Sequence, residues 1–290
     1  MEVLGLAAKI HRRQGAWEKS TQEFEHALAL DPRNTDLVAD LVDTYNAMRQ
    51  FDVQGELYDR LIDAFPGNPS LKVDKALAVQ YQKYGDKAAV WAAIAELPAS
   101  IANDPVILRH SLCLALSDRD WSKADHLLEQ LKSSKDAVSF AYTPTRIPIG
   151  CFALFLARLQ GKRPGAEFDE ARAQLAKSVE GTPDDAGLLS ELAVTDALLG
   201  RKDDALKEAR MAVEMTPVAK DALDGPRFVI NEAVVYAWAV QPDLAFDRLA
   251  VSAQTPNGIV YGELKVDPLW DPIRQDPRYE KLLAELVPKD

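Results

Sequence analysis

The feature that most constrains the fold of this chain is a sequence period of 34 residues. Residues 1–34 align with residues 35–68 without a gap, so that Trp17 lies opposite Phe51, and residues 186–219 keep the same frame. A period of this length is typical of repeat proteins, in which each unit is one supersecondary motif that stacks on its neighbours. We therefore interpret the chain as an array of such units.

Each unit has the pattern of two amphipathic helices. In the first unit, Leu4, Ala8 and His11 follow the spacing of one helix face. Gly15 breaks this helix and allows a turn, because glycine accepts backbone conformations that other residues avoid. A second helix carries Phe24 and ends before Pro32, since the residue that precedes a proline disfavours the helical conformation.

The remaining chain holds weaker copies of the same unit. The turn of the third copy is displaced to Gly85, the fifth copy is expanded in its turn, and an insertion at 220–225 precedes the seventh. A solenoid needs a terminal element that covers its last apolar face, and residues 260–290 suit this role as a C-terminal capping segment. The units are expected at about residues 1–34, 35–68, 69–103, 105–138, 143–185, 186–219 and 226–259.

The spacing of large apolar residues, glycine and alanine resembles that of the tetratricopeptide repeat, or TPR. This resemblance implies an all-α fold, a right-handed TPR superhelix (α-solenoid) of about seven helix-turn-helix repeats plus a C-terminal capping helix. The ending, the segment DALDGPRFV and the expanded fifth repeat also resemble the C-terminal TPR region of bacterial multidomain regulators. Those regulators carry a Ser/Thr kinase, a nucleotide cyclase or a winged-helix domain. Because the first residues are already in frame, we expect the chain to be the signalling part of such a longer protein.

The resemblance also implies a function and a surface for it. In this family the first helix of each unit lines a concave groove, which implies a non-catalytic protein–protein interaction scaffold that binds a peptide or a partner domain. Gly5 and Lys9 stand where chaperone-binding members carry a lysine and an asparagine, so we do not expect a chaperone tail as the ligand. The groove residues carried over from the family pattern are Lys9, Arg12, Arg13, Asp43, Asn46, Arg109, Cys113, Leu116, Phe155, Arg158, Asn231 and Trp238.

This inferred groove is polar at its N-terminal end and apolar at its C-terminal end. Exposed apolar surface is unfavourable by about 25 cal/mol per Å², so a contiguous apolar patch usually marks a binding site. Three outcomes stay open: a partner segment fills the apolar half, the superhelix curls so that the loops at 141–147 and 220–225 cover it, or its residues pack between neighbouring helices. The alternative function is a small-molecule sensor whose groove closes over an apolar ligand.

Motifs of catalysis and cofactor binding are absent from the sequence. It contains no glycine-rich phosphate loop, no GxSxG, no HExxH and no CxxC. His110, Cys113 and His126 could be imagined as a metal site, but a zinc site normally has more ligands at tighter spacing. We therefore expect no enzymatic activity, no cofactor and no bound metal.

Charge and hydropathy narrow the class of partner. The net charge of −11 repels phosphate backbones, so we expect a protein or peptide partner and no nucleic acid. The longest nearly uncharged apolar stretch, residues 147–157, is far shorter than the ~20 residues that span a bilayer, which predicts no membrane insertion. We expect a monomer or weak dimer in the cytoplasm, or in the periplasm if the parent regulator is membrane-anchored.

Overall fold

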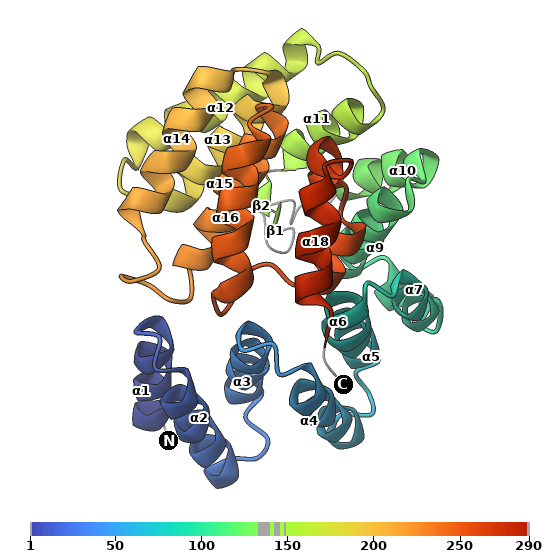
Figure 1. Ribbon diagram of the computed structural model, residues 1–290. Coiled ribbons are helices and arrows are strands. Elements are labelled where there is room, and N and C mark those ends of the chain that lie inside the picture. Colours follow the sequence, from blue (N-terminus) through green and yellow to red (C-terminus); the bar gives the residue numbers. More distant parts are fainter. Residues whose placement is uncertain (1, 133–139, 142–145, 148, 289–290) are drawn as a thin grey trace.

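The computed structural model describes residues 2–132, 140–141, 146–147 and 149–288 of the chain (Figure 1). Within these ranges nearly every regular element is a helix, and successive helices are antiparallel neighbours joined by short turns. The expected all-α solenoid of about seven hairpins with a C-terminal helix is confirmed. None of the helices in the described ranges is long and apolar enough to cross a membrane.

Seven hairpins follow one another along the chain. Their helices are α1 (Glu2–Arg13) and α2 (Trp17–Leu30); α3 (Thr35–Ala47) and α4 (Phe51–Ala64); a first helix composed of α5 (Ser70–Lys75), η1 (Ala76–Tyr81) and α6 (Gln82–Tyr84), with α7 (Lys87–Ala95); α9 (Pro105–Asp118) and α10 (Trp121–Lys132); α11 (Ile149–Leu159) and α12 (Ala166–Gly181); α13 (Ala186–Leu199) and α14 (Lys202–Met215); and α15 (Gly225–Trp238) and α16 (Pro242–Gln254). A short helix, α8 (Ala99–Ala102), connects the third hairpin to the fourth.

One residue in the turn of each hairpin adopts the left-handed backbone conformation. Glycine takes this conformation without strain, whereas for other residues it is uncommon and unfavourable. The first and second of these residues lie 34 positions apart, as do the third and fourth, so the sequence period reappears in the backbone. These seven residues are Gly15, Arg49, Gly85, Arg119, Gly161, Gly200 and Val240.

The third hairpin contains the irregularity that the displaced Gly85 indicated. Its first helix changes to π-helical geometry between Ala76 and Tyr81, after a regular α-helical start. A π-turn takes in an extra residue without ending the helix, which explains how this unit holds its inserted residues. The helix α4 packs closely on this segment at Gly55. A Cβ added to Gly55 would lie 3.3 Å from Cγ2 of Val79.

The array curls until its first hairpins meet the seventh (Figure 1). The guanidinium of Arg49, in the turn of the second hairpin, donates to the carbonyl oxygens of Ser252, Thr255 and Ile259 at 3.2, 3.1 and 3.0 Å. At the C-terminal end of α1, Arg13 forms ion pairs with the loop that precedes α15. The turn edge of the N-terminal hairpins thus closes the molecule into a ring.

The C-terminal segment lies inside this ring rather than only on its end. It consists of α17 (Tyr261–Val266), the 3-10 helix η2 (Pro268–Ile273) and α18 (Pro277–Leu286), which contact α6, α15 and α16 respectively. Gly262 allows the close approach, since a Cβ there would lie 1.7 Å from the carbonyl oxygen of Tyr81. The segment therefore covers the inner sides of hairpins that are distant in sequence.

A small β-ribbon also lies within the ring. Strands β1 (Phe140–Ala141) and β2 (Arg146–Ile147) pair antiparallel, and β2 contacts α13 (Figure 1). The loop predicted to fold over the groove includes residues 142–145, which lie outside the described residues. The start of the predicted fifth unit falls partly outside them as well.

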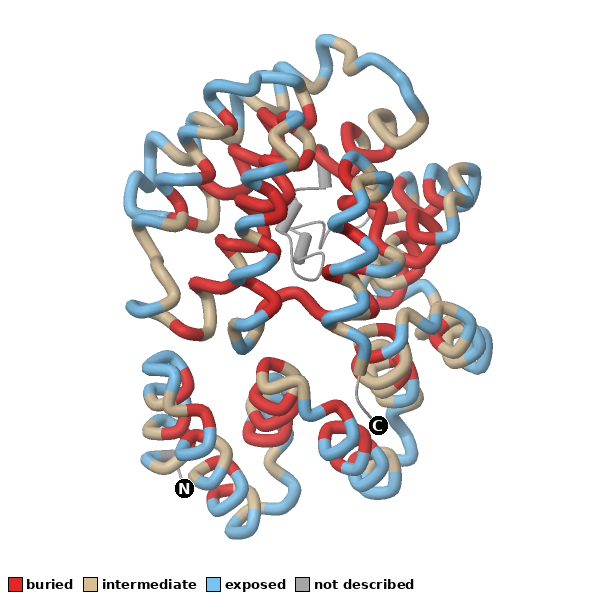
Figure 2. The backbone as a smooth tube through the Cα atoms, viewed as in Figure 1, coloured by how far each residue is buried: buried red, intermediate tan, exposed pale blue. Residues whose placement is uncertain are grey.

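The two largest apolar clusters of the described residues lie in different parts of the ring. One extends from α9 to α18 and holds Trp270, Tyr279 and Phe155, all almost completely buried. The other joins α1, α2, α3 and α4 around Phe24 and Leu41. Figure 2 shows that burial is denser in the upper part of the ring, where the first cluster lies. We call hairpins one and two the arm, and hairpins five to seven with the C-terminal segment the body.

Candidate functional site

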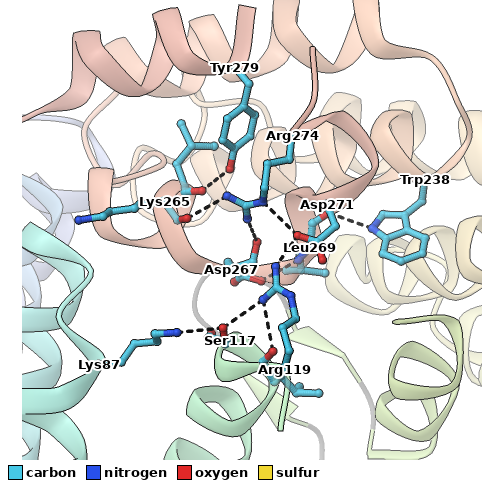
Figure 3. A network of polar contacts seen from close by, with 12 residues as sticks. Lys87, Ser117, Arg119, Trp238, Lys265, Asp267, Leu269, Asp271, Arg274 and Tyr279 are labelled. Atoms are coloured by element: carbon cyan, nitrogen blue, oxygen red, sulfur yellow. Dashed lines mark hydrogen bonds and ion pairs between the residues drawn. The ribbon is translucent and has the colours of Figure 1, made fainter. Parts of the chain in front are cut away.

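The apolar half of the predicted groove lies in the packed interior. Leu116 and Phe155 are completely buried, and the ring of Phe155 meets that of Trp238 edge-on, with centroids 5.8 Å apart. The indole nitrogen of Trp238 donates to the carbonyl oxygen of Leu269 in the C-terminal segment at 2.9 Å (Figure 3). The chain itself thus occupies this half, and contact of these residues with a partner stays a prediction.

Other predicted groove residues surround the same interior. Asn231 is buried and donates from Nδ2 to Oγ of Ser190 at 2.7 Å. The guanidinium of Arg158 lies over the ring of Trp238, with its carbon 5.9 Å from the centroid. Cys113 is a half-buried free thiol on α9, where burial raises the thiol pKa and disfavours the reactive thiolate.

The neighbouring groups on α9 behave as interior residues too. Arg109 is half-buried, and burial, with a smaller effect of Arg109, lowers the pKa of His110 to about 4. The imidazole is therefore neutral at pH 7. Within the ranges that the structure describes, no group of three or more His, Cys, Asp or Glu side chains could hold a metal ion.

The structure brings together the charged residues predicted on the first two hairpins. Asp40 accepts from Lys9 Nζ at 2.8 Å and from Arg12 Nη2 at 2.8 Å, which joins α1 to α3. Arg12 is buried, lies over the ring of Phe24 and also donates to Thr44 Oγ1, so it has a structural role. Lys9 remains exposed.

Arg13, by contrast, lies where the first hairpin contacts the loop before α15 and helps to close the ring. Its guanidinium binds Asp221 and, at 2.7 Å, Asp224, both in the loop before α15. These residues border an open cleft of about 910 Å³ that also contains Asp185 and Lys220. Because Arg13 already pairs with two of the carboxylates and Lys220 donates to a backbone carbonyl, the cleft holds mainly satisfied charges.

A smaller pocket of about 320 Å³ lies between the second and third hairpins. The repeat pattern predicted Asp43 as a residue of the groove. In the structure Asp43 is exposed on α3 and lines this pocket. Asn46, one turn further along α3, is half-buried and has no hydrogen-bond partner for its Oδ1 among the described residues. The pocket residues are Thr35, Val38, Ala39, Val42, Asp43, Tyr58, Leu61, Phe65, Asn68, Leu71 and Asp74.

Sequence reasoning missed the third-hairpin side of this pocket. Asp74 lies between Lys72 and Lys75, and such a charged run is usually a solvated face. In the structure the two lysines pair elsewhere, Lys72 with Glu96 and Lys75 with Asp59, while Asp74 lines the pocket. An available signal was the repeat frame itself, because Asp74 lies 34 residues after Asp40 and before the irregular part of its helix.

The sequence matches no family model and no curated protein. Solved structures do match, among them a tetratricopeptide repeat protein from Parabacteroides merdae. That protein is 11% identical to this chain, with a TM-score of 0.48, and the match covers 99% of this chain and 98% of that one.

Proposed function

We propose that the chain is a non-catalytic interaction scaffold that binds a peptide or a partner domain on its first three hairpins. The observation that carries this proposal is the pocket between α3, α4 and α5, whose apolar walls and carboxylates stand open on preformed helices. A rigid surface of this kind orders few of its own residues on binding, which favours affinity. The acidic surface of the chain favours a protein partner over nucleic acid.

The proposal keeps only part of the predicted groove. Asp43 lines the pocket, Asn46 lies one turn further along α3, and Lys9 is exposed on α1 where it pairs with Asp40 of α3; we retain these three as contact residues. We further propose that residues 1–259 form the binding solenoid and that 260–290 stabilise it from inside the ring. A role as the regulatory part of a larger bacterial protein rests on the sequence resemblance alone and stays a prediction.

A displayed library of random peptides, selected against the immobilised chain, tests the proposal. We expect enriched peptides with dissociation constants in the micromolar range, about −8 kcal/mol. Asp43→Lys should abolish their binding. Glu56→Lys, the same charge change at an exposed position of α4 outside the pocket lining, should leave it intact. Failure to enrich any peptide, or equal binding by both variants, would contradict the scaffold function.

A further inference from the structure

The pocket between the second and third hairpins combines an apolar wall with acidic groups. The wall is formed by Val38 and Val42 of α3, Leu61 of α4, Phe65 directly after α4, and Leu71 of α5. Its volume of about 320 Å³ is at the lower end of the range of about 300–1,000 Å³ for ligand pockets. There is thus room for one or two side chains rather than for a large cofactor.

The carboxylate of Asp74 is the group in this pocket whose charge is least compensated. It is half-buried, and no residue in the described ranges forms an ion pair or hydrogen bond with it. Burial raises its pKa to about 6. An ionised carboxylate that is removed from water without a cation is unfavourable, and an opposite charge placed beside it would relieve that cost.

Asp43 adds a second negative charge at the same place. Both carboxylates act on the hydroxyl of Tyr58, where burial first and then the charges of Asp74 and Asp43 raise the pKa of the phenol. The charge of Arg12 acts on Asp43, but the described hydrogen bonds of Arg12 go to Asp40 and Thr44. The two acids therefore share one pocket in which no lysine or arginine of the chain forms an ion pair with them, among the residues described.

We propose that this pocket binds a lysine or arginine side chain of a partner segment, with its alkyl stem on the apolar wall and its cationic head between Asp43 and Asp74. The inference rests on the proposed function and specifies the partner's chemistry. Long basic side chains have the required form, because an apolar stem carries the charge at its end. Charge-assisted hydrogen bonds to carboxylates are about twice as strong as neutral ones, which makes the head group the main determinant of specificity.

Two small probes of equal shape test the charge requirement. N-acetyl-arginine methyl ester and N-acetyl-citrulline methyl ester differ in that citrulline replaces the guanidinium by a neutral urea. In NMR titrations of the full chain, the arginine probe should shift the amides around Asp43, Tyr58 and Asp74 at millimolar concentration. The citrulline probe should bind at least about tenfold more weakly, because it lacks the charge-assisted bonds. Equal binding of both probes, or no shift with arginine, would overturn the inference.

Matched variants locate the binding at the two carboxylates. Asp74→Asn and Asp43→Asn should each weaken the arginine probe by about tenfold. Asp63→Asn, at an exposed position of α4 outside the lining, should not. Because burial disfavours the ionised form of Asp74, its replacement should keep or raise the melting temperature, so unfolding cannot explain a loss of binding. Undiminished binding by Asp74→Asn would refute the assignment.

Acidification supplies an independent readout. The bound cation requires an ionised carboxylate, so binding of the arginine probe should weaken as the pH falls through about 6 in the wild type. The groups that act on Asp74 or Asp43 are Tyr58, whose raised pKa keeps it neutral here, Arg12 and the carboxylate of Asp40. Burial raises the pKa of Asp43 as well, so both carboxylates contribute to the loss of binding on acidification. Binding of the arginine probe that does not change with pH would contradict the role of Asp74.

The experiments distinguish a failure of the basic-side-chain pocket from a failure of the scaffold function. Selected peptides that bind the first three hairpins without a basic residue, and that ignore Asp74→Asn, would refute the basic-side-chain pocket and leave the scaffold standing. Binding of the arginine probe without any enriched peptide would support the pocket and overturn the scaffold.

Discussion

The arm and the body are built from the same kind of hairpin, but the first helices of their hairpins are buried to different degrees. In α15 of the body twelve of 14 residues are buried, whereas in α3 of the arm seven of 13 are. The second helices do not differ in this way, since three of 14 residues are buried in α14 and four of 14 in α2. The difference comes from what covers each helix. The helix α15 packs against α13, α14, α16 and η2, whereas α3 packs mainly against α1, α2 and α4. The C-terminal segment thus adds burial to the first helices of the body, whereas the second helices of both regions keep the low burial of the repeat unit.

Polar groups in the two regions show the consequence. In the body, the carboxylate of Asp196 is completely buried and accepts two short hydrogen bonds from Arg172, at 2.7 and 2.9 Å. Glu232 is buried as well and pairs with Arg248 at 2.9 Å. In the arm, the pairs of Asp40 lie nearer the surface, and Lys9 in them is exposed. Changes in the body should therefore have larger effects than equivalent changes in the arm.

The largest expected effect comes from truncating one aromatic side chain in each region. Trp270→Ala should destabilise the body by about 3–5 kcal/mol, because it removes a completely buried ring from the larger cluster. Phe24→Ala makes the matched change in the cluster of the arm. We expect hydrogen exchange to accelerate in α1–α4 alone for Phe24→Ala, and throughout the body for Trp270→Ala. A single cooperative loss of protection over the whole chain in both variants would show that arm and body are one unit.

The next largest effect on stability is expected at the contact between the arm and the body. Arg49→Ala removes the guanidinium that binds three carbonyl oxygens of the seventh hairpin and should cost about 2–3 kcal/mol. The arm should swing away from the body, which small-angle scattering would record as a larger radius of gyration. Arg33→Ala, at an exposed position of the arm, is the control and should change neither quantity. An unchanged radius for Arg49→Ala would mean that other contacts suffice to close the ring.

A pH-dependent effect is expected at the same contact. Burial, and to a lesser extent Asp267, raise the pKa of Glu263 to about 8, against about 4.3 in an unfolded chain. Between these values the folded state binds more protons than the unfolded state, so stability falls as the pH rises, by up to about 1.4 kcal/mol per pH unit. Glu263→Gln should flatten this fall between about pH 5 and 8. Denaturant titrations at several pH values measure it, and an unaltered slope would exclude Glu263 as its source.

The smallest effect compares two equivalent turns. Gly15 in the first hairpin and Val240 in the seventh adopt the same left-handed conformation, which is unfavourable for a β-branched residue. Val240 is also 79% exposed, so its side chain contributes little packing. Val240→Gly should stabilise the chain by about 0.5–1 kcal/mol, because relief of strain exceeds the added entropy of the unfolded state. A lower melting temperature in calorimetry would show that the strain is compensated locally.

The candidate site was predicted only on the side of the second hairpin. Asp43 and Asn46 were found because the second unit follows the 34-residue period without interruption. Asp74 was missed although it precedes the π-helical turn and lies 34 residues after Asp40, because no sequence signal shows that Lys72 and Lys75 pair elsewhere. The apolar positions such as Phe155 were recognised as needing cover, but the segment that covers them could not be identified from spacing.

The sequence by itself determined the helices, their pairing into hairpins and the places of the turns. These features depend on interactions between residues close in the chain: the apolar periodicity of each helix and the left-handed turn residue, glycine at four of seven positions. Only the tertiary structure decided that the array closes, that Arg49 meets residues 252–259, and that Trp270 lies inside the ring. The curvature of a solenoid is the sum of small rotations between neighbouring units, and each rotation depends on packing at an interface that no local pattern describes.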